Sequence, residues 1–128
     1  MRKEKLTKAA ILLLKSLIKT PSFSSEEHET ALLIESWFKD SDITFNRTNN
    51  NIWATNKYFD ETKPTLLLNS HHDTVKPTKG YTKDPFDPII NAGKLYGLGS
   101  NDAGGCLVSL LATFSFFYHY KNFERCIL

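Results

Sequence analysis

Hydrophobic residues recur at the spacing of an α-helix in three parts of the chain, within residues 5–18, 24–40 and 102–118. The positions that would share one helix face are Leu6, Ala10, Leu13, Leu14 and Leu17 in the first part, Ala31, Ile34, Trp37 and Phe38 in the second, and Leu107, Leu110, Leu111, Phe114 and Phe117 in the third. Lysines follow the opposite flank of the first part, and Pro21 ends it. The pattern predicts three helices, each packing one face against a core.

The second and third helices have recognisable starts. Ser24 followed by Glu27 forms a capping-box pattern, in which the hydroxyl and the carboxylate each satisfy a backbone N–H of the first turn. Asp102 stands where the third pattern begins and is followed by small residues. We therefore expect the second helix to run from this cap to about Asp40, and the third to begin at Asp102.

Two short stretches read as hairpins. Apolar and polar residues alternate over 43–47 and continue over 52–54, on either side of Asn49 and Asn50, which tolerate left-handed turn geometry. Residues 89–96 repeat this arrangement around a turn that contains Gly93.

The continuous apolar run at residues 65–69 is typical of a central strand that is buried on both faces. Residues 126–128 resemble the opening of another buried strand. Helices and strands in this order indicate the α/β class, with a central mixed sheet flanked by helices and no internal domain boundary.

Composition and charge narrow the function classes. The chain has 128 residues and a formal net charge of +2, with basic and acidic residues interleaved, so no basic stripe suggests nucleic acid. No apolar run approaches the roughly twenty residues of a membrane span, and Lys15 interrupts the one stretch that resembles a signal peptide. Cys106 and Cys126 lack metal-ligand spacing and read as small core residues of a cytoplasmic protein.

The first candidate chemical group follows the predicted central strand, where α/β sheets usually place catalytic residues. If the backbone stays extended there, His71 and Asp73 share one side of the chain and His72 points away. Neutral imidazole is a common zinc ligand, and a carboxylate can fix its tautomer. We therefore predict His71 as a ligand supported by Asp73. The alternative is a strand end with exposed polar residues.

Asp102 is the second candidate, because the glycines around it let the backbone turn sharply and hold its carboxylate in a fixed place. A carboxylate has two oxygens, so Asp102 is suited to bridging two metal ions. The alternative is an aspartate that only caps a helix.

Three segments together resemble one enzyme family. They are residues 66–77 (Leu-Leu-Leu-Asn-Ser-His-His-Asp-Thr-Val-Lys-Pro), residues 84–86 (Asp-Pro-Phe) and residues 93–105 (Gly-Lys-Leu-Tyr-Gly-Leu-Gly-Ser-Asn-Asp-Ala-Gly-Gly). In order and spacing they resemble the zinc metallopeptidases and deacylases that include acetylornithine deacetylase, succinyl-diaminopimelate desuccinylase and aminoacylase. Residues 20–24 resemble the loop between the family's first two helices, so the likeness covers the chain from about Lys5 onward.

The resemblance implies that residues 1–128 are the amino-terminal part of a zinc-exopeptidase-like catalytic domain. By this likeness His71 binds one zinc ion, Asp102 bridges two, and Asp73 acts in catalysis by supporting His71; cobalt can substitute for zinc. The implied substrate is a small N-acyl amino acid, most like N-acetylornithine, which is cleaved to ornithine and acetate in arginine biosynthesis. The implied enzyme is cytoplasmic, binds neither nucleic acid nor membrane, and forms a homodimer when intact. No substrate-binding residue is assigned.

The chain departs from the family pattern in several ways. Leu98 stands where many members carry Arg, and Ala103 where many carry Met. Relatives also have a Glu-Glu pair after the next strand, whose first member is the general base, then further acidic and histidine ligands and a lid or dimerisation domain. His28 and His119 belong to no ligand-spaced motif and are not substitutes. We therefore expect a truncated and inactive catalytic domain.

Other functions stay open at this point. The chain could be a non-catalytic remnant or interaction module that associates through an unpaired strand edge near Ile127. A dipeptidase, tripeptidase or carboxypeptidase of the same family is a further alternative. A Glu-Glu pair within the next fifty or so residues, about one further βα unit, would favour the truncated enzyme.

Overall fold

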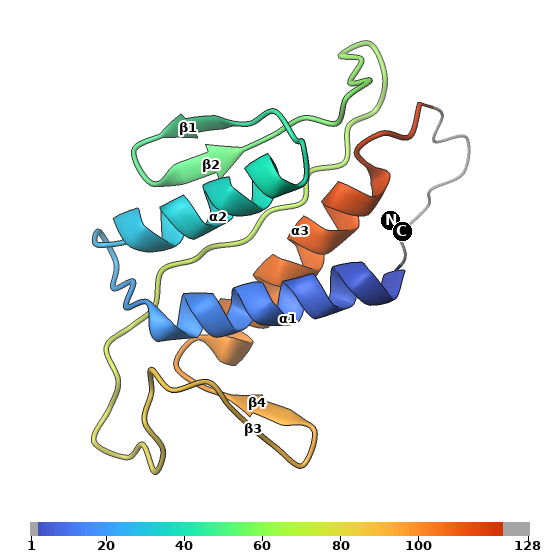
Figure 1. The fold of residues 1–128 in the computed structure, drawn as a ribbon. Helices are drawn as coiled ribbons and strands as arrows, with labels where there is room; N and C mark the ends of the chain where they lie inside the picture. The colour runs from blue at the N-terminus through green and yellow to red at the C-terminus, as the bar shows by residue number, and fades with distance from the viewer. Residues whose placement is uncertain (1–2, 122–128) are drawn as a thin grey trace.

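The computed structural model describes residues 3–121, in which three α-helices accompany two separate hairpins (Figure 1). The elements are α1 (Lys3–Lys19), α2 (His28–Asp40), β1 (Asn46–Thr48), β2 (Asn51–Trp53), β3 (Ile89–Asn91), β4 (Lys94–Tyr96), a π-helical turn (Ser100–Gly104) and α3 (Gly105–Phe117). The mixture of helices and strands agrees with the predicted class. The helix periodicities predicted α1 and the carboxyl end of α2 closely.

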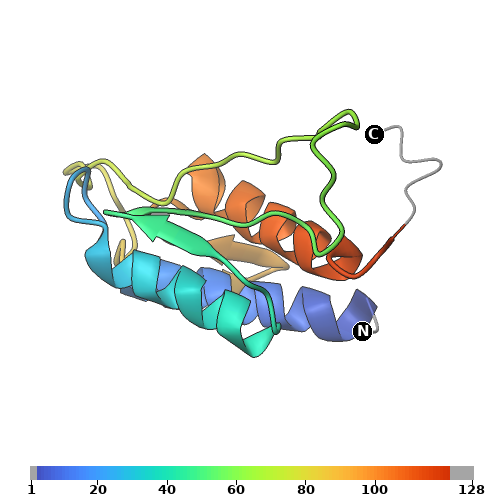
Figure 2. The same ribbon diagram turned by 90° about the horizontal axis from the view of Figure 1, so that it is seen from above.

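The core lies between the three helices, since α1 packs against both α2 and α3 (Figure 1). Most of its buried side chains lie at positions that the periodicity predicted, but Val108 does not, and the predicted Leu14, Leu110, Phe114 and Phe117 are only partly buried. Ile43 and Tyr118 complete the core. Figure 2 shows the green-to-yellow stretch that follows β2 lying along the opposite side of this helical layer from α1. The helices therefore support an extended segment that carries the candidate site residues.

Substituting Ile34 by Val should lower the free energy of unfolding by about 1 kcal/mol, because its side chain is only 4% exposed and loses one buried methyl group. Ile11 is the matched control: it is also on a helix, but it is 42% exposed. Ile11→Val should change the free energy by less than about 0.5 kcal/mol. Urea unfolding of both variants measures the difference, and equal losses would contradict the described core.

Both predicted hairpins are confirmed. Thr48 pairs with Asn51 across the first turn, in which Asn49 takes a left-handed φ of 54°. In the second, Ala92 and Gly93 both take positive φ angles. The two hairpins form separate two-stranded antiparallel sheets.

The predicted central strand at residues 65–69 is wrong for the described structure. This stretch is extended but unpaired, and Leu66 and Leu67 are 64% and 80% exposed. Within residues 3–121, no strand lies hydrogen-bonded to either edge of it, so no central mixed sheet forms. An apolar run indicates that a strand can be buried, but burial also needs neighbours on both sides. The other strand predicted for this sheet, at residues 126–128, lies outside the described residues.

Neither predicted helix start is confirmed. Helix α2 begins at His28 after Glu27, which caps it without a side-chain hydrogen bond, and Ser24 lies in the preceding turn. Asp102 has φ −124° and ψ 95°, so it precedes α3 in a non-helical conformation and makes no capping hydrogen bond. The side chains of Ser24 and Asp102 are therefore free to contact other residues.

Helix α3 is strongly apolar, yet Cys106 in its first turn is exposed, so the prediction that it is a core residue is wrong. The core face of α3 passes instead through Leu107, Val108 and Leu111. In the described part of the chain, no helix combines the length and the apolar character that crossing a bilayer requires.

Candidate metal centre

The turn between α1 and α2 anchors the segment that contains the histidines. The backbone N–H of Thr74 donates to the carbonyl of Ser22 at 2.8 Å, and Phe23 and Thr74 form a parallel bridge. The hydroxyl of Ser22 donates to the carbonyl of His72, also at 2.8 Å. These bonds fix the backbone at the point where residues 71–73 project their side chains.

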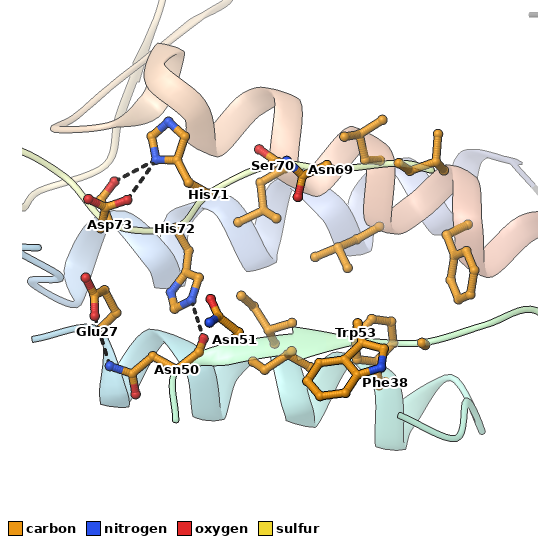
Figure 3. A pocket seen from close by; sticks show the side chains of 18 of the residues that line it. Glu27, Phe38, Asn50, Asn51, Trp53, Asn69, Ser70, His71, His72 and Asp73 are labelled. Carbon is orange, nitrogen blue, oxygen red and sulfur yellow. Dashed lines mark hydrogen bonds and ion pairs between the residues drawn. The ribbon is translucent and has the colours of Figure 1, made fainter. Parts of the chain in front are cut away.

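His71, Asp73 and Asp102 lie together. Nδ1 of His71 is 3.1 Å from Oδ1 of Asp73, and Nε2 is 3.0 Å from Oδ1 of Asp102. His71 and Asp73 occupy one side of the chain, and His72 points to the other (Figure 3), as the alternation of side chains predicts. The fold therefore brings together residues that are 31 positions apart in the sequence.

Ser24 is a member of this cluster that the sequence pattern did not reveal. Its hydroxyl donates to Oδ2 of Asp73 at 2.6 Å. This hydrogen bond, ahead of the charge of His71, holds the pKa of Asp73 below its ordinary value, because it stabilises the carboxylate form. The sequence predicted Ser24 as part of a capping box. Its hydrogen bond to Asp73 becomes visible only when the position of Asp73 in space is known.

Gly99 lets the Asp102 segment approach the histidine segment. It takes a left-handed φ of 72°, and a Cβ atom built on it would lie 2.6 Å from Cγ2 of Thr74. Asp102, three residues later, keeps its side chain 89% exposed. One carboxylate oxygen faces His71, and within residues 3–121 the other has no hydrogen-bond partner.

The Asp-Pro-Phe segment at residues 84–86 contacts two other parts of the molecule. The ring of Phe86 packs edge-on against Phe23 at a centroid distance of 6.3 Å. The carbonyl of Pro85 accepts a hydrogen bond from the backbone N–H of Leu98 at 2.6 Å. Leu98, where the family pattern often has Arg, is buried. This segment therefore links the turn between α1 and α2 to the glycine-rich turn.

The arrangement around His71 favours a cation. A neutral imidazole has one N–H and one lone pair, but here each ring nitrogen faces a carboxylate oxygen. If Nδ1–H donates to Asp73, the lone pair of Nε2 meets the oxygen of Asp102, and only a proton or a metal ion placed there relieves the repulsion. Burial alone lowers the pKa of His71, but the hydrogen bond to Asp102 and the charges of both carboxylates outweigh it and raise the pKa.

Asp102→Asn should lower the pKa of His71, because the amide keeps the shape but removes the charge that favours the imidazolium. In the metal-free chain, the stabilisation from the raised pKa is complete below about pH 6.5, the ordinary value for histidine, and is lost as the pH rises through the raised pKa. NMR titration measures the pKa, and pH-dependent unfolding measures the stability. Asp60→Asn, at a carboxylate that bonds Thr62, is the control and should leave His71 unchanged.

The donor set fits part of a zinc site. Imidazole nitrogen and carboxylate oxygen are both zinc ligands, but a catalytic zinc normally has about three protein ligands. Among residues 3–121, no group of three histidine, cysteine or acidic side chains is placed to hold one ion. His28 contacts Arg47, and His119 packs against Tyr118, so neither joins His71. The described residues therefore offer two ligands, His71 and Asp102, and Asp73 contacts the ring of His71.

A groove of about 460 Å³ opens on the His72 side of the segment, between β2 and residues 67–73 (Figure 3). Its floor is apolar and comes from α2 and α3. His71 and Asp73 line the groove but Asp102 does not, so the groove reaches only part of the cluster.

Comparison with known proteins gives a consistent result. Residues 67–121, which hold the whole cluster except Ser24, match the model of peptidase family M20/M25/M40. The chain is 31% identical over 125 residues to a succinyl-diaminopimelate desuccinylase from Blochmanniella floridana, covering 91% of this chain and 33% of that protein. It is 34% identical over 113 residues to an acetylornithine deacetylase from Shigella sonnei (strain Ss046), covering 77% of this chain and 29% of that protein. The chain thus spans about a third of the length of these relatives.

Proposed function

Since the chain belongs to peptidase family M20/M25/M40, we propose that it contributes two metal ligands to a zinc-dependent amidohydrolase that removes the acyl group from an N-acyl amino acid. His71 and Asp102 are the proposed ligands, and Asp73 holds His71. The observation that carries the proposal is the position of His71, whose two ring nitrogens each face a carboxylate.

The residues of this chain would act by binding and orienting. Asp73 would accept a hydrogen bond from Nδ1–H of His71. This bond leaves the lone pair of Nε2 for a metal and increases the basicity of the ring. Asp102 would share its two oxygens between two ions. Zinc, when bound, supplies a Lewis acid that polarises the amide carbonyl and lowers the pKa of a water molecule toward about 7. A general base and further ligands would come from other parts of a complete site.

N-acetylornithine is the proposed substrate, with release of ornithine and acetate in the cytoplasm. The names of the two relatives support acyl removal from an amino-acid-like molecule, but they differ in the acyl group. A dipeptidase, tripeptidase or carboxypeptidase activity is the alternative within the family. Parallel assays with N-acetylornithine, an N-succinyl amino acid and a dipeptide, on a protein that includes a complete site, decide between them.

Metal content after dialysis tests the proposed ligands. The purified chain should retain zinc above the level of the buffer, and cobalt should replace it. A chain that binds no more zinc than the His71→Ala, Asp102→Ala double variant would contradict the proposal.

The 128-residue chain alone should not turn over N-acetylornithine at a measurable rate, because its described residues offer two ligands where about three are normal. Product release with and without added zinc is the measurement. Robust zinc-dependent turnover by this chain would contradict the expectation.

A second candidate function is self-association rather than catalysis, and the exposed Leu66 and Leu67 support it. The extended stretch that carries them has no hydrogen-bonded neighbour within residues 3–121 and could pair with the same stretch of a second copy. Sedimentation of the chain and of its Leu67→Lys variant tests this candidate. A concentration-dependent dimer that the substitution dissociates would support association, and a monomer at all concentrations would exclude it.

A further inference from the structure

The His72 side chain is held on both of its ring nitrogens. Nδ1 lies 2.8 Å from the hydroxyl of Thr30, and Nε2 lies 2.9 Å from the carbonyl of Asn50. A carbonyl only accepts, so Nε2–H donates to Asn50, while Nδ1 pairs with the Thr30 hydroxyl. The same hydroxyl donates to the carbonyl of Glu27 at 3.1 Å. Both ring nitrogens of His72 thus have a hydrogen-bond partner.

The two partners of His72 come from different elements, and each is itself fixed. Thr30 belongs to α2 and is 1% exposed. Asn50 lies in the turn between β1 and β2, where its side-chain amide donates to Glu27 at 2.9 Å (Figure 3). Arg47 further holds the turn by donating to the carbonyl of Asn49. The ring is therefore clamped between a helix and a hairpin.

This clamp bears on the direction of His71. Successive side chains of an extended backbone point to opposite sides, so a fixed ring at His72 also fixes how the backbone is rotated about its own axis at His71 and Asp73. The bonds made by Ser22 hold the backbone at the His72 carbonyl and the Thr74 N–H, and the clamped ring of His72 holds the same segment through a side chain. Figure 3 shows His71 and His72 on opposite sides of the segment.

We propose that His72 is a positioning residue: through Thr30 and Asn50 it sets the direction in which His71 presents Nε2 toward Asp102. It binds no metal and touches no reacting atom. The consequence for metal affinity rests on the proposed function, whereas the consequence for the His71 ring does not.

The metal-free chain, labelled with ¹⁵N-histidine, provides the first test. At a pH above the raised pKa of His71, where its ring is neutral, long-range ¹H–¹⁵N spectra should show a single tautomer with the proton on Nδ1. The loss of these signals in His71→Ala assigns them. His72→Leu fills the space without hydrogen bonds, and its His71 signals should broaden or move toward a tautomer mixture. His72→Gln keeps a donor that reaches Asn50 and should restore the native signals.

Ser115→Ala is the control for a purely structural effect. It removes the buried hydrogen bond that Trp37 donates at 2.9 Å, far along α3 from the candidate site. This variant should lose stability while its His71 signals stay native. Unchanged His71 signals in His72→Leu, or equal changes in Ser115→Ala, would overturn the proposal.

Zinc titration provides the second test. His72→Leu should raise the zinc dissociation constant roughly tenfold, the lower end of the range for residues that orient a ligand, and His72→Gln should stay within about threefold of the native value. In a His71→Ala background, His72→Leu should have no further effect. If the native chain binds no zinc, the proposed function fails, but the His71 spectra still decide whether His72 positions the ring.

Discussion

Gly99→Ala should destabilise the chain by about 3 kcal/mol in urea unfolding. Two costs add: the left-handed φ of 72°, about 1 kcal/mol for an L-residue, and the overlap of the new methyl group with Thr74, about 2 kcal/mol for a well-packed contact. The same displacement should move Asp102 away from His71, so the variant should also bind zinc less tightly. This position joins the fold to the candidate site.

Gly93→Ala is a close control for the first cost alone. Gly93 has a φ of 75°, but nothing lies within 4 Å of its added Cβ atom, so we expect a loss of about 1 kcal/mol. Thr74→Ser removes the overlapping methyl group and should recover much of the excess loss in the Gly99→Ala background. Equal losses at the two glycines would show that the described contact between Gly99 and Thr74 does not exist.

Substituting either proposed ligand by alanine should weaken zinc binding more than about 100-fold, beyond the 10–100-fold range typical of residues behind the ligands. Ser24→Ala should fall inside that range, near tenfold, because it only removes the hydroxyl that holds Asp73. Calorimetric titration of His71→Ala, Asp102→Ala and Ser24→Ala gives the order of the losses.

His28→Ala is the control for non-specific zinc binding by histidine. His28 contacts Arg47 at the start of α2 and should contribute nothing to zinc affinity. If His28→Ala and His71→Ala weakened binding equally, the ion would be bound by scattered surface groups. An unchanged affinity in Asp102→Ala would remove Asp102 from the site.

Local signals predicted the parts of the fold that depend on local interactions. Periodicity located the helices because each buries one continuous face, and Asn49 and Gly93 marked turns that need positive φ. The prediction of a central strand at residues 65–69 was wrong because apolar side chains do not indicate whether neighbouring strands are present. The prediction that Ser24 caps α2 was wrong because its hydroxyl donates instead to a carboxylate that is distant in the sequence.

The candidate site was predictable in composition but not in its supports. Alternation separated His71 from His72, and the glycine-rich segment marked Asp102 as fixed in place. The supporting contacts of Ser24, Thr30 and Asn50 depend on packing between elements far apart in the sequence, which no local pattern records. The metal-binding roles themselves stay predictions.

A crystal of the zinc-loaded chain, measured at the zinc absorption edge, tests most directly whether His71 and Asp102 bind the metal. We expect an anomalous peak at about 2.0–2.2 Å from Nε2 of His71 and from a carboxylate oxygen of Asp102. A well-ordered zinc ion bound elsewhere, with Nε2 of His71 still in contact with Asp102 and no peak between them, would contradict it.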